Sequence, residues 1–183
     1  CSQWHTFGLT DFESINDMKK TAVLLCFCWI LAFLPILGQN KYSILPKPAR
    51  LDVKEGHFSF SKDLIIAVAG TDPELRRLAE GFAQQIGRVA GRDTKVFAGN
   101  FRVKDGINFV VSKDPKLGIE GYFLEVTPKR IVITAEHAKG FASGLKSLMQ
   151  LMPAEVFGTI RVEGVTWKIP CCYIEDQPIA EQR

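Results

Sequence analysis

The stretch from Glu120 to Met152 reads EGYFLEVTPKRIVITAEHAKGFASGLKSLMQLM. In two runs of this stretch, apolar side chains alternate with other side chains, and the two runs are joined by Thr-Pro-Lys-Arg. This pattern is typical of an antiparallel hairpin with one buried face. That face would carry Tyr122, Leu124, Val126, Ile131, Ile133 and Ala135. After His137 the apolar spacing becomes helical, with one face made of Phe141, Leu145, Leu148 and Met152. A hairpin and an amphipathic helix can bury these two faces against each other.

A second amphipathic helix is predicted between Asp72 and Gly91. Asp72 is a capping residue, Pro73 suits the first helical position, and Gly91 suits the left-handed position after the helix. Its apolar face consists of Leu75, Leu78, Phe82, Ile86 and Val89. The predicted order of elements is β-β-α-β-β-β-β-α-β. We therefore expect an α+β fold, a mainly antiparallel sheet with two helices packed on one face.

Shorter patterns predict the other strands. The apolar run Leu64–Ala69 indicates a strand buried on both sides. Residues 51–53 and 58–60 alternate on either side of Glu55-Gly56, which predicts two short strands joined by a turn. Residues 158–164, bounded by glycines, are expected to form a short hairpin arm.

Residues 18–38 have the order of a signal peptide: basic Met18-Lys19-Lys20, an apolar run over 22–34, and small Gly38 before polar residues. The apolar run is shorter than the roughly 20 residues that span a bilayer. We therefore expect a periplasmic or secreted protein, with no membrane association after cleavage. Residues 1–17 are expected to lie upstream of the native start, and residues 41–178 to form the α+β domain.

The composition is that of a globular protein. The chain has 183 residues, 46% hydrophobic and 23% charged, enough for one domain plus tails. The net charge is +3, but basic pairs such as Arg76-Arg77 and Lys129-Arg130 are isolated among acidic residues. Nucleic-acid binders concentrate their basic residues on one surface, so no nucleic-acid partner is expected.

No residue pattern predicts catalysis, a metal site or a cofactor site. Phosphate-binding loops, dinucleotide-binding glycine motifs and hydrolase nucleophile motifs are absent from the sequence. His5 precedes the mature protein, and His137 is interpreted as a solvated residue where a strand meets a helix. Glu175 and Asp176 are neighbours on an extended segment, so their carboxylates would diverge, whereas those of a glycosidase converge on one bond.

Two pairs of small residues are assigned structural roles. Cys171 and Cys172 would point to opposite faces of a strand, and adjacent cysteines rarely satisfy disulfide geometry, so no redox or metal role is expected. Gly140 and Gly144, four residues apart, would let a helix and a sheet approach closely.

Four segments together resemble the non-catalytic N-terminal domain of family 20 glycoside hydrolases, the β-N-acetylhexosaminidases. They are the ILPKP of 44–48, the EGYFLEV of 120–126 with the IVITA of 131–135, the GFASGLKSLMQL of 140–151, and the WKIP of 167–170 with the IEDQP of 174–178. The resemblance covers residues 41–178. It departs from the family at Lys146-Ser147, where the family commonly has Gln-Thr.

The resemblance implies a secreted glycosidase that hydrolyses terminal non-reducing N-acetylhexosamine residues. In the family a following (β/α)8 barrel supplies the catalytic Asp-Glu pair and binds the glycan, using the substrate's acetamido group as nucleophile. That barrel would be this domain's partner. Residues 179–183 would be its truncated start, and this fragment would be inactive. Arg183 matches the position of a sugar-binding arginine, although Ile179–Gln182 depart from the family pattern.

Two alternatives stay open at this stage. The chain could be a stand-alone extracytoplasmic domain that binds carbohydrate or protein. It could also be the N-terminal domain of another glycoside hydrolase, such as an α-glucuronidase or an O-GlcNAcase-like enzyme.

The signal-peptide assignment predicts where the exported protein begins. N-terminal sequencing of material secreted by an expressing host should start close to Gln39, because cleavage follows small residues such as Gly38. A first residue before Met18 would contradict the assignment.

Overall fold

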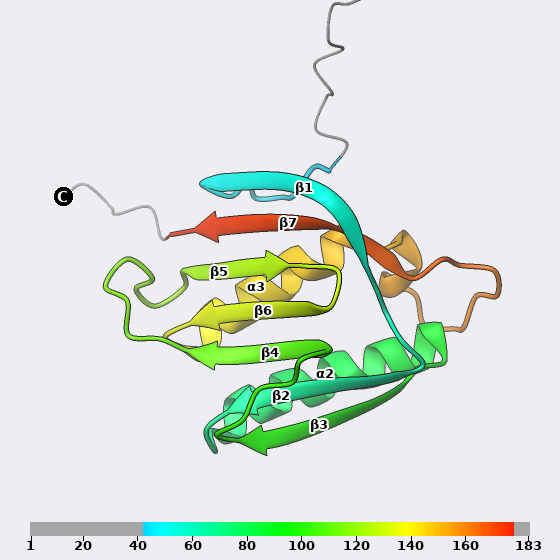
Figure 1. Cartoon of the computed structure of the whole chain (residues 1–183), viewed down its shortest axis with the longest axis horizontal. Coiled ribbons are helices and arrows are strands. Elements are labelled where there is room, and N and C mark those ends of the chain that lie inside the picture. The colour runs from blue at the N-terminus through cyan, green and yellow to red at the C-terminus, as the bar shows by residue number, and fades with distance from the viewer. Residues whose placement is uncertain (1–41, 178–183) are drawn as a thin grey trace, which may run out of the picture. The chain divides into compact units, whose positions relative to one another are not determined.

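One seven-stranded sheet with two helices forms the domain (Figure 1). The computed structural model describes residues 42–177, so the predicted segments 1–17, 18–38 and 179–183 lie outside the described residues. The strands run in the order β1-β7-β5-β6-β4-β2-β3 across the sheet. The elements are β1 (Arg50–Ser59), β2 (Asp63–Ala69), α2 (Pro73–Ala90), β3 (Asp93–Gly99), β4 (Gly106–Val111), β5 (Tyr122–Val126), β6 (Arg130–Ala135), α3 (Ala138–Leu151), the 3-10 helix η1 (Ala154–Phe157) and β7 (Lys168–Asp176).

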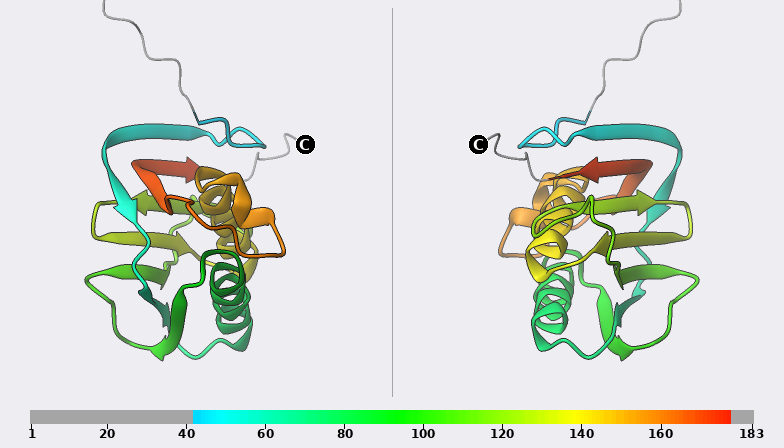
Figure 2. Two further views of the ribbon diagram at one scale, coloured as in Figure 1. Left: turned by 90° about the vertical axis from the view of Figure 1, so that its right-hand side faces the viewer. Right: turned by 90° about the vertical axis from the view of Figure 1, so that its left-hand side faces the viewer.

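The predicted order of strands and α-helices is confirmed. Both helices lie on the same side of the sheet, as Figure 2 shows, so that part of the expected architecture is confirmed as well. The fold is α+β, with one face of the sheet covered by α2 and α3. The opposite face, which we call the open face, carries no helix from the described residues.

The expectation of a mainly antiparallel sheet was wrong, because the sheet is mixed. Strands β1, β7, β5 and β6 pair antiparallel, whereas β6–β4, β4–β2 and β2–β3 pair parallel. Helix α2 connects β2 to β3 and returns the chain to the end where β2 began, which makes the two strands parallel. Alternation of side chains along a strand shows which face of that strand is buried. It does not show which other strand pairs with it, or whether the two run parallel or antiparallel.

The hairpin and helix predicted from residues 120–152 form the centre of the domain. Strands β5 and β6 pair antiparallel, with Tyr122 opposite Ala135, and the predicted inward-facing residues of both strands are buried. Phe141 on α3 stacks on Phe109 of β4, with ring centroids 5.3 Å apart. The hydroxyls of Tyr122 and Ser147 form a buried hydrogen bond of 2.6 Å. The two apolar faces are packed together as expected.

Helix α2 begins and ends as predicted. The side chain of Asp72 accepts a hydrogen bond of 2.8 Å from the Glu74 amide, and Pro73 is the first helical residue. Gly91 ends the helix in the left-handed conformation, with φ of 61°. Most of the predicted apolar face is buried, with Leu78 half-buried. Local capping chemistry and periodicity therefore set the limits of this helix.

Two local predictions were wrong. Strand β1 is one strand, not two joined by a turn, because Glu55 and Gly56 lie in an irregularity between Val53 and His57 and pairing with β7 resumes beyond it. Residues 158–164 form no hairpin arm, and the segment between η1 and β7 is irregular. Gly56 has a positive φ of 96°, which occurs in β-bulges as well as in turns. The glycine at this position therefore could not distinguish a turn between two strands from an irregularity within one strand.

The buried face of α2 supports a stability prediction. Phe82 is 4% exposed, so Phe82→Asp removes its packing, at a cost of about 3–5 kcal/mol, and also buries a charge. We expect loss of the cooperative thermal transition. Gln84→Asp on the exposed side of the same helix is the matched control and should melt close to the wild type. An unchanged melt for Phe82→Asp would show that the face is assigned wrongly.

Candidate functional site

The described residues bring no catalytic constellation together. Within 42–177 no group of His, Cys, Asp and Glu side chains could hold a metal ion. No described helix is both long and apolar enough to cross a membrane. His57 and His137 are exposed, and His137 precedes α3 without a side-chain capping bond. The interpretation of His137 as a solvated residue at the start of a helix is confirmed.

The carboxylates of Glu175 and Asp176 diverge, as predicted. Glu175 lies opposite Phe123 and Asp176 opposite Tyr122, on alternate sides of β7. Each carboxylate accepts a hydrogen bond within the domain. Glu175 Oε1 accepts from the side-chain amide of Gln177 at 2.7 Å, and Asp176 Oδ1 accepts from the backbone N–H of Ala49 at 3.4 Å. The pair cannot act on one glycosidic bond.

The two cysteines of β7 are buried free thiols. Burial raises the pKa of Cys171 and raises the pKa of Cys172 to about 12. Both therefore stay protonated at neutral pH, where only a thiolate would act as a nucleophile or metal ligand. Burial also raises the pKa of Tyr122 to about 12, although its hydrogen bond to Ser147 acts in the opposite direction. These buried groups serve packing.

Two glutamines join separate segments, and sequence reasoning missed both roles. Gln150 near the end of α3 binds the backbone of Leu45: its Oε1 accepts from the amide at 2.8 Å and its Nε2 donates to the carbonyl at 2.9 Å. Gln85 on α2 donates from Nε2 to the carbonyls of Val156 and Gly158, at 2.6 and 2.8 Å. The partners are 105, 71 and 73 residues away along the chain, so no local pattern could reveal them.

Gly140 and Gly144 lie where α3 meets the hairpin, as predicted. A Cβ atom on Gly140 would lie 2.4 Å from the carbonyl oxygen of Gly121, and one on Gly144 would lie 2.7 Å from Cγ2 of Ile133. Real Cβ atoms do not approach other atoms so closely. Both positions therefore need glycine for close packing, without any ligand.

The open face carries an aromatic and charged cluster on β1, β7 and β5. The rings of Phe123 and Tyr173 are stacked with centroids 6.3 Å apart. Over the Tyr173 ring lie the guanidinium of Arg50, at 5.6 Å from the centroid, and the ammonium of Lys54, at 6.0 Å. Arg50 also pairs with Asp52. Strand pairing brings these residues together, because β7 pairs with both β1 and β5.

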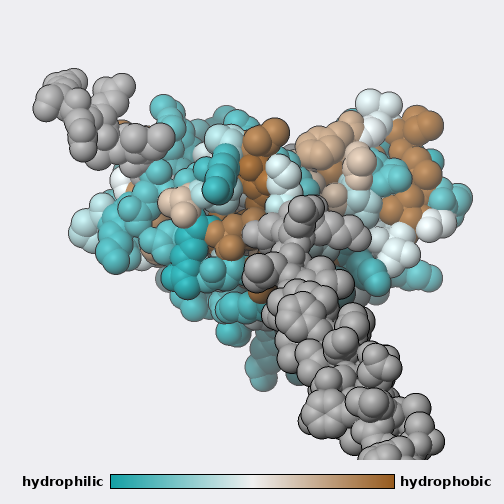
Figure 3. All heavy atoms as spheres, turned by 90° about the horizontal axis from the view of Figure 1, so that it is seen from above, coloured by the Kyte–Doolittle hydropathy of each residue, from teal (hydrophilic) through white to brown (hydrophobic). Residues whose placement is uncertain are grey.

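Apolar side chains are also exposed on the helix α3–β7 connection. Phe157, Ile160 and Val162 are 61%, 72% and 42% exposed. Seen from the β1 side, the described surface mixes hydrophilic and hydrophobic residues, with the hydrophobic ones in separate patches (Figure 3). Phe157, Ile160 and Val162 lie within six positions of one another along the chain, and contiguous exposed apolar surface is typical of sites that another domain or protein covers.

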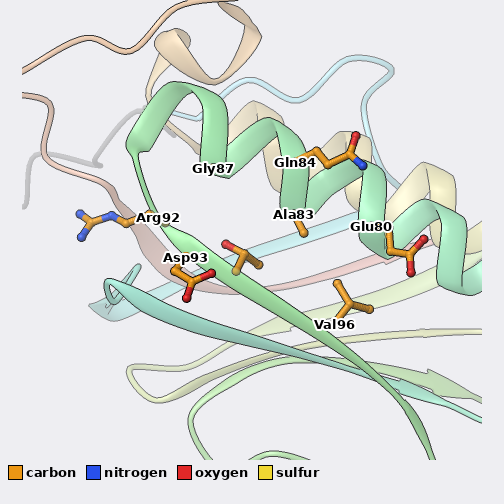
Figure 4. Close-up of a pocket in the computed structure, with 8 residues that line it drawn as sticks. Glu80, Ala83, Gln84, Gly87, Arg92, Asp93 and Val96 are labelled. Carbon is orange, nitrogen blue, oxygen red and sulfur yellow. The ribbon is translucent and has the colours of Figure 1, made fainter.

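A groove of about 380 Å³ lies between α2 and β3 (Figure 4). Helix α2 contributes Glu80, Ala83 and Gly87, and the strand contributes Asp93, Thr94 and Val96. The side chain of Arg92 points away from the other labelled residues. The groove is lined by carboxylates and small side chains. Its lining residues do not include a nucleophile that is hydrogen-bonded to a base which a third group orients, the arrangement that catalysis requires.

Comparison with known proteins assigns the domain to a family. A model of a protein family described as "Glycosyl hydrolase family 20, domain 2" matches residues 41–177. The chain belongs to this family. The match spans all the residues that the structure describes, so the resemblance found in the four sequence segments is confirmed.

Relatives of this family 20 domain 2 are hexosaminidases. A Beta-hexosaminidase of Porphyromonas gingivalis is 24% identical over 88% of this chain and 22% of its own length. A Beta-N-acetylhexosaminidase of Cellulomonas fimi is 26% identical over 74% of this chain and 26% of its own length. The solved N-acetyl-beta-hexosaminidase of Streptomyces plicatus has a TM-score of 0.66 at 26% identity, covering 79% of this chain and 28% of that one. The chain thus spans about a quarter of the length of these relatives.

The motifs that mark the family 20 domain are structural in this chain. Gly140, Gly144 and Gln150 maintain packing and join segments, while Tyr122 and Ser147 share a buried hydrogen bond. Arg183, the one predicted substrate-binding residue, lies outside the described residues and stays a prediction.

The close approach at Gly140 can be tested with a matched pair of variants. Gly140→Ala should destabilise the domain by about 1–3 kcal/mol, because the new methyl group meets a backbone oxygen that cannot move aside. Gly81→Ala, on the exposed side of α2 with no atom within 4 Å, should stabilise by up to about 1 kcal/mol through helix propensity. Urea denaturation of both variants checks the signs. Equal effects would contradict the packing argument.

Proposed function

We propose that this chain is the non-catalytic accessory domain of an exported β-N-acetylhexosaminidase. Such an enzyme hydrolyses terminal non-reducing N-acetylhexosamine residues, with a separate catalytic barrel doing the chemistry. The observation that carries the proposal is the family match over residues 41–177 in a domain whose described residues form no catalytic or metal site. Export is supported by the signal-peptide pattern of residues 18–38.

The domain's role in this proposal is to support the barrel. The relatives are about four times as long as the matched segment, which leaves room for a catalytic domain in each of them. The exposed Phe157, Ile160 and Val162 supply apolar surface of the kind that a neighbouring domain covers. The glycan would be bound by the barrel, with Arg183 as a candidate contact at the junction.

An activity assay tests the absence of catalysis in the chain itself. The purified 183-residue chain should release no chromophore from a chromogenic β-N-acetylglucosaminide above the buffer blank. The physical reason is that Glu175 and Asp176, the adjacent carboxylates of β7, point to opposite sides of the strand and cannot converge on one bond. Turnover that co-purifies with the chain would contradict the proposal.

A chimera tests the accessory role directly. Replacing the matching domain of the Streptomyces plicatus relative with residues 41–177 should give a folded, active hexosaminidase, because the two domains share their fold with a TM-score of 0.66. The same chimera carrying Gly140→Ala should lose thermal stability while its catalytic groups stay unchanged. An insoluble chimera from wild-type residues 41–177 would count against the role as a support for the barrel.

A second candidate function rests on the open face. The stacked Phe123 and Tyr173 rings, with Arg50 and Asp52 beside them, combine an aromatic surface with hydrogen-bonding groups. Such a surface could bind a glycan chain independently of the barrel. Binding of chitin oligosaccharides that is abolished by Tyr173→Ala, but kept by the exposed Phe97→Ala, would favour this candidate.

A further inference from the structure

The outer edge of β3 offers regular, unused backbone groups. Strand β3 is the last in the sheet, and its pairing with β2 is continuous from Asp93 to Gly99. The N–H of Asp93 donates to Lys62 and the carbonyl of Gly99 accepts from Gly70, so the odd-numbered residues bond to β2. Neighbouring residues of a strand direct their backbone groups to opposite sides. The N–H and C=O groups of the even-numbered residues 94, 96 and 98 therefore point outward, where no described strand pairs with them.

The opposite edge of the sheet is protected, and β3 is not. Strand β1 is interrupted between Val53 and His57, and its exposed Lys54 lies within this irregular part. Bulges, prolines and charges are the usual means by which natural edge strands avoid pairing with other chains. Strand β3 has no proline and no irregularity in its register. Its only lysine, Lys95, alternates with Thr94 and Val96, which line the groove beside α2, and its ammonium lies 3.8 Å from the carboxylate of Asp93.

The groove beside β3 has room for the side chains of an added strand. Thr94 and Val96 line it from the strand, opposite the small residues Ala83 and Gly87 of α2. Oγ1 of Thr94 is buried and has no hydrogen-bond partner among the described residues. Buried hydroxyls normally have a partner, but an oxygen without exposed surface can meet one on another chain only after its side chain rotates. A rotation about the Cα–Cβ bond would exchange the hydroxyl with the methyl group.

We propose that this edge pairs with the same edge of a second copy of the chain, antiparallel, with Thr94 on the two-fold axis. The two sheets would then be joined through residues 92–96 of each copy. Residues 97–99 extend beyond the strand of the second copy, because the residues opposite them, 89–91, form the end of α2. Thr94 lies opposite Thr94 of the second copy, and the two residues exchange both of their backbone hydrogen bonds. Their rotated hydroxyls also come within reach of each other, as cross-strand threonine pairs do.

The sequence of β3 is complementary to itself in this register. Asp93 lies opposite Lys95 of the second copy, and Lys95 opposite Asp93, so two pairs of opposite charge form on the open face. Centring the axis on Lys95 would instead place two lysines opposite each other, which is unfavourable. An isologous contact of this kind needs only one surface patch, used twice. A second copy is therefore a better occupant than an unrelated strand.

Cysteine trapping tests the register. In a chain with Cys1, Cys26 and Cys28 changed to serine, Thr94→Cys should give a disulfide-linked dimer under mild oxidation. Directly opposite, hydrogen-bonded residues have Cα atoms about 5.5 Å apart, within the disulfide range. Lys95→Cys in the same background is the control and should stay monomeric on a non-reducing gel. A dimer from Lys95→Cys alone, or from neither variant, would overturn the proposal.

Sedimentation equilibrium tests the association itself. The wild-type chain should show a concentration-dependent equilibrium between monomer and dimer. Thr94→Asp places two carboxylates on the axis and should raise the dimer dissociation constant roughly tenfold or more, whereas Thr94→Ser keeps the hydroxyl and should leave it within about twofold. Far-ultraviolet circular dichroism establishes that each variant is folded. A wild-type chain that remains monomeric up to the highest soluble concentration would overturn the proposal.

Discussion

Helix α3 lies so close to the β5–β6 hairpin that neither Gly140 nor Gly144 could carry a methyl group without a clash. This contact determines the position of several other parts. It brings the hydroxyls of Tyr122 and Ser147 together in the interior and stacks Phe141 on the neighbouring strand β4. At the end of the same helix, Gln150 fixes the segment that leads into β1. The sheet is thereby tied to its first strand through the helix on its covered face.

The polar chemistry of the domain serves this architecture. Buried hydroxyl, thiol and amide groups that might suggest a reactive centre are instead hydrogen-bonded to distant segments or kept protonated by burial. In the proposed function a separate barrel performs catalysis, and the domain needs only a stable shape and surfaces for contact. Its candidate interaction surfaces lie on the periphery, at the aromatic cluster of the open face, the exposed side chains of residues 157–162, and the edge of β3.

The parts of this architecture that could be predicted are those that depend on neighbours in sequence. The capping of α2 by Asp72, its end at Gly91 and the inward faces of β5 and β6 each follow from a few consecutive residues. The mixed direction of the sheet could not be predicted in this way, because pairing is decided between segments far apart. The same applies to the glutamine contacts of Gln85 and Gln150, and to the position of β3 at an edge.

The sequence by itself determined the α+β class, the order of the elements, the common face of the two helices and the membership of family 20. Its periodicities and short motifs record which side of each element is buried. Only the tertiary structure decided that β2, β3, β4 and β6 run parallel, and that β1 bends around an irregularity at Gly56. The reason is physical: the free energy of strand pairing depends on how the whole apolar surface is buried at once, and no single segment contains that information.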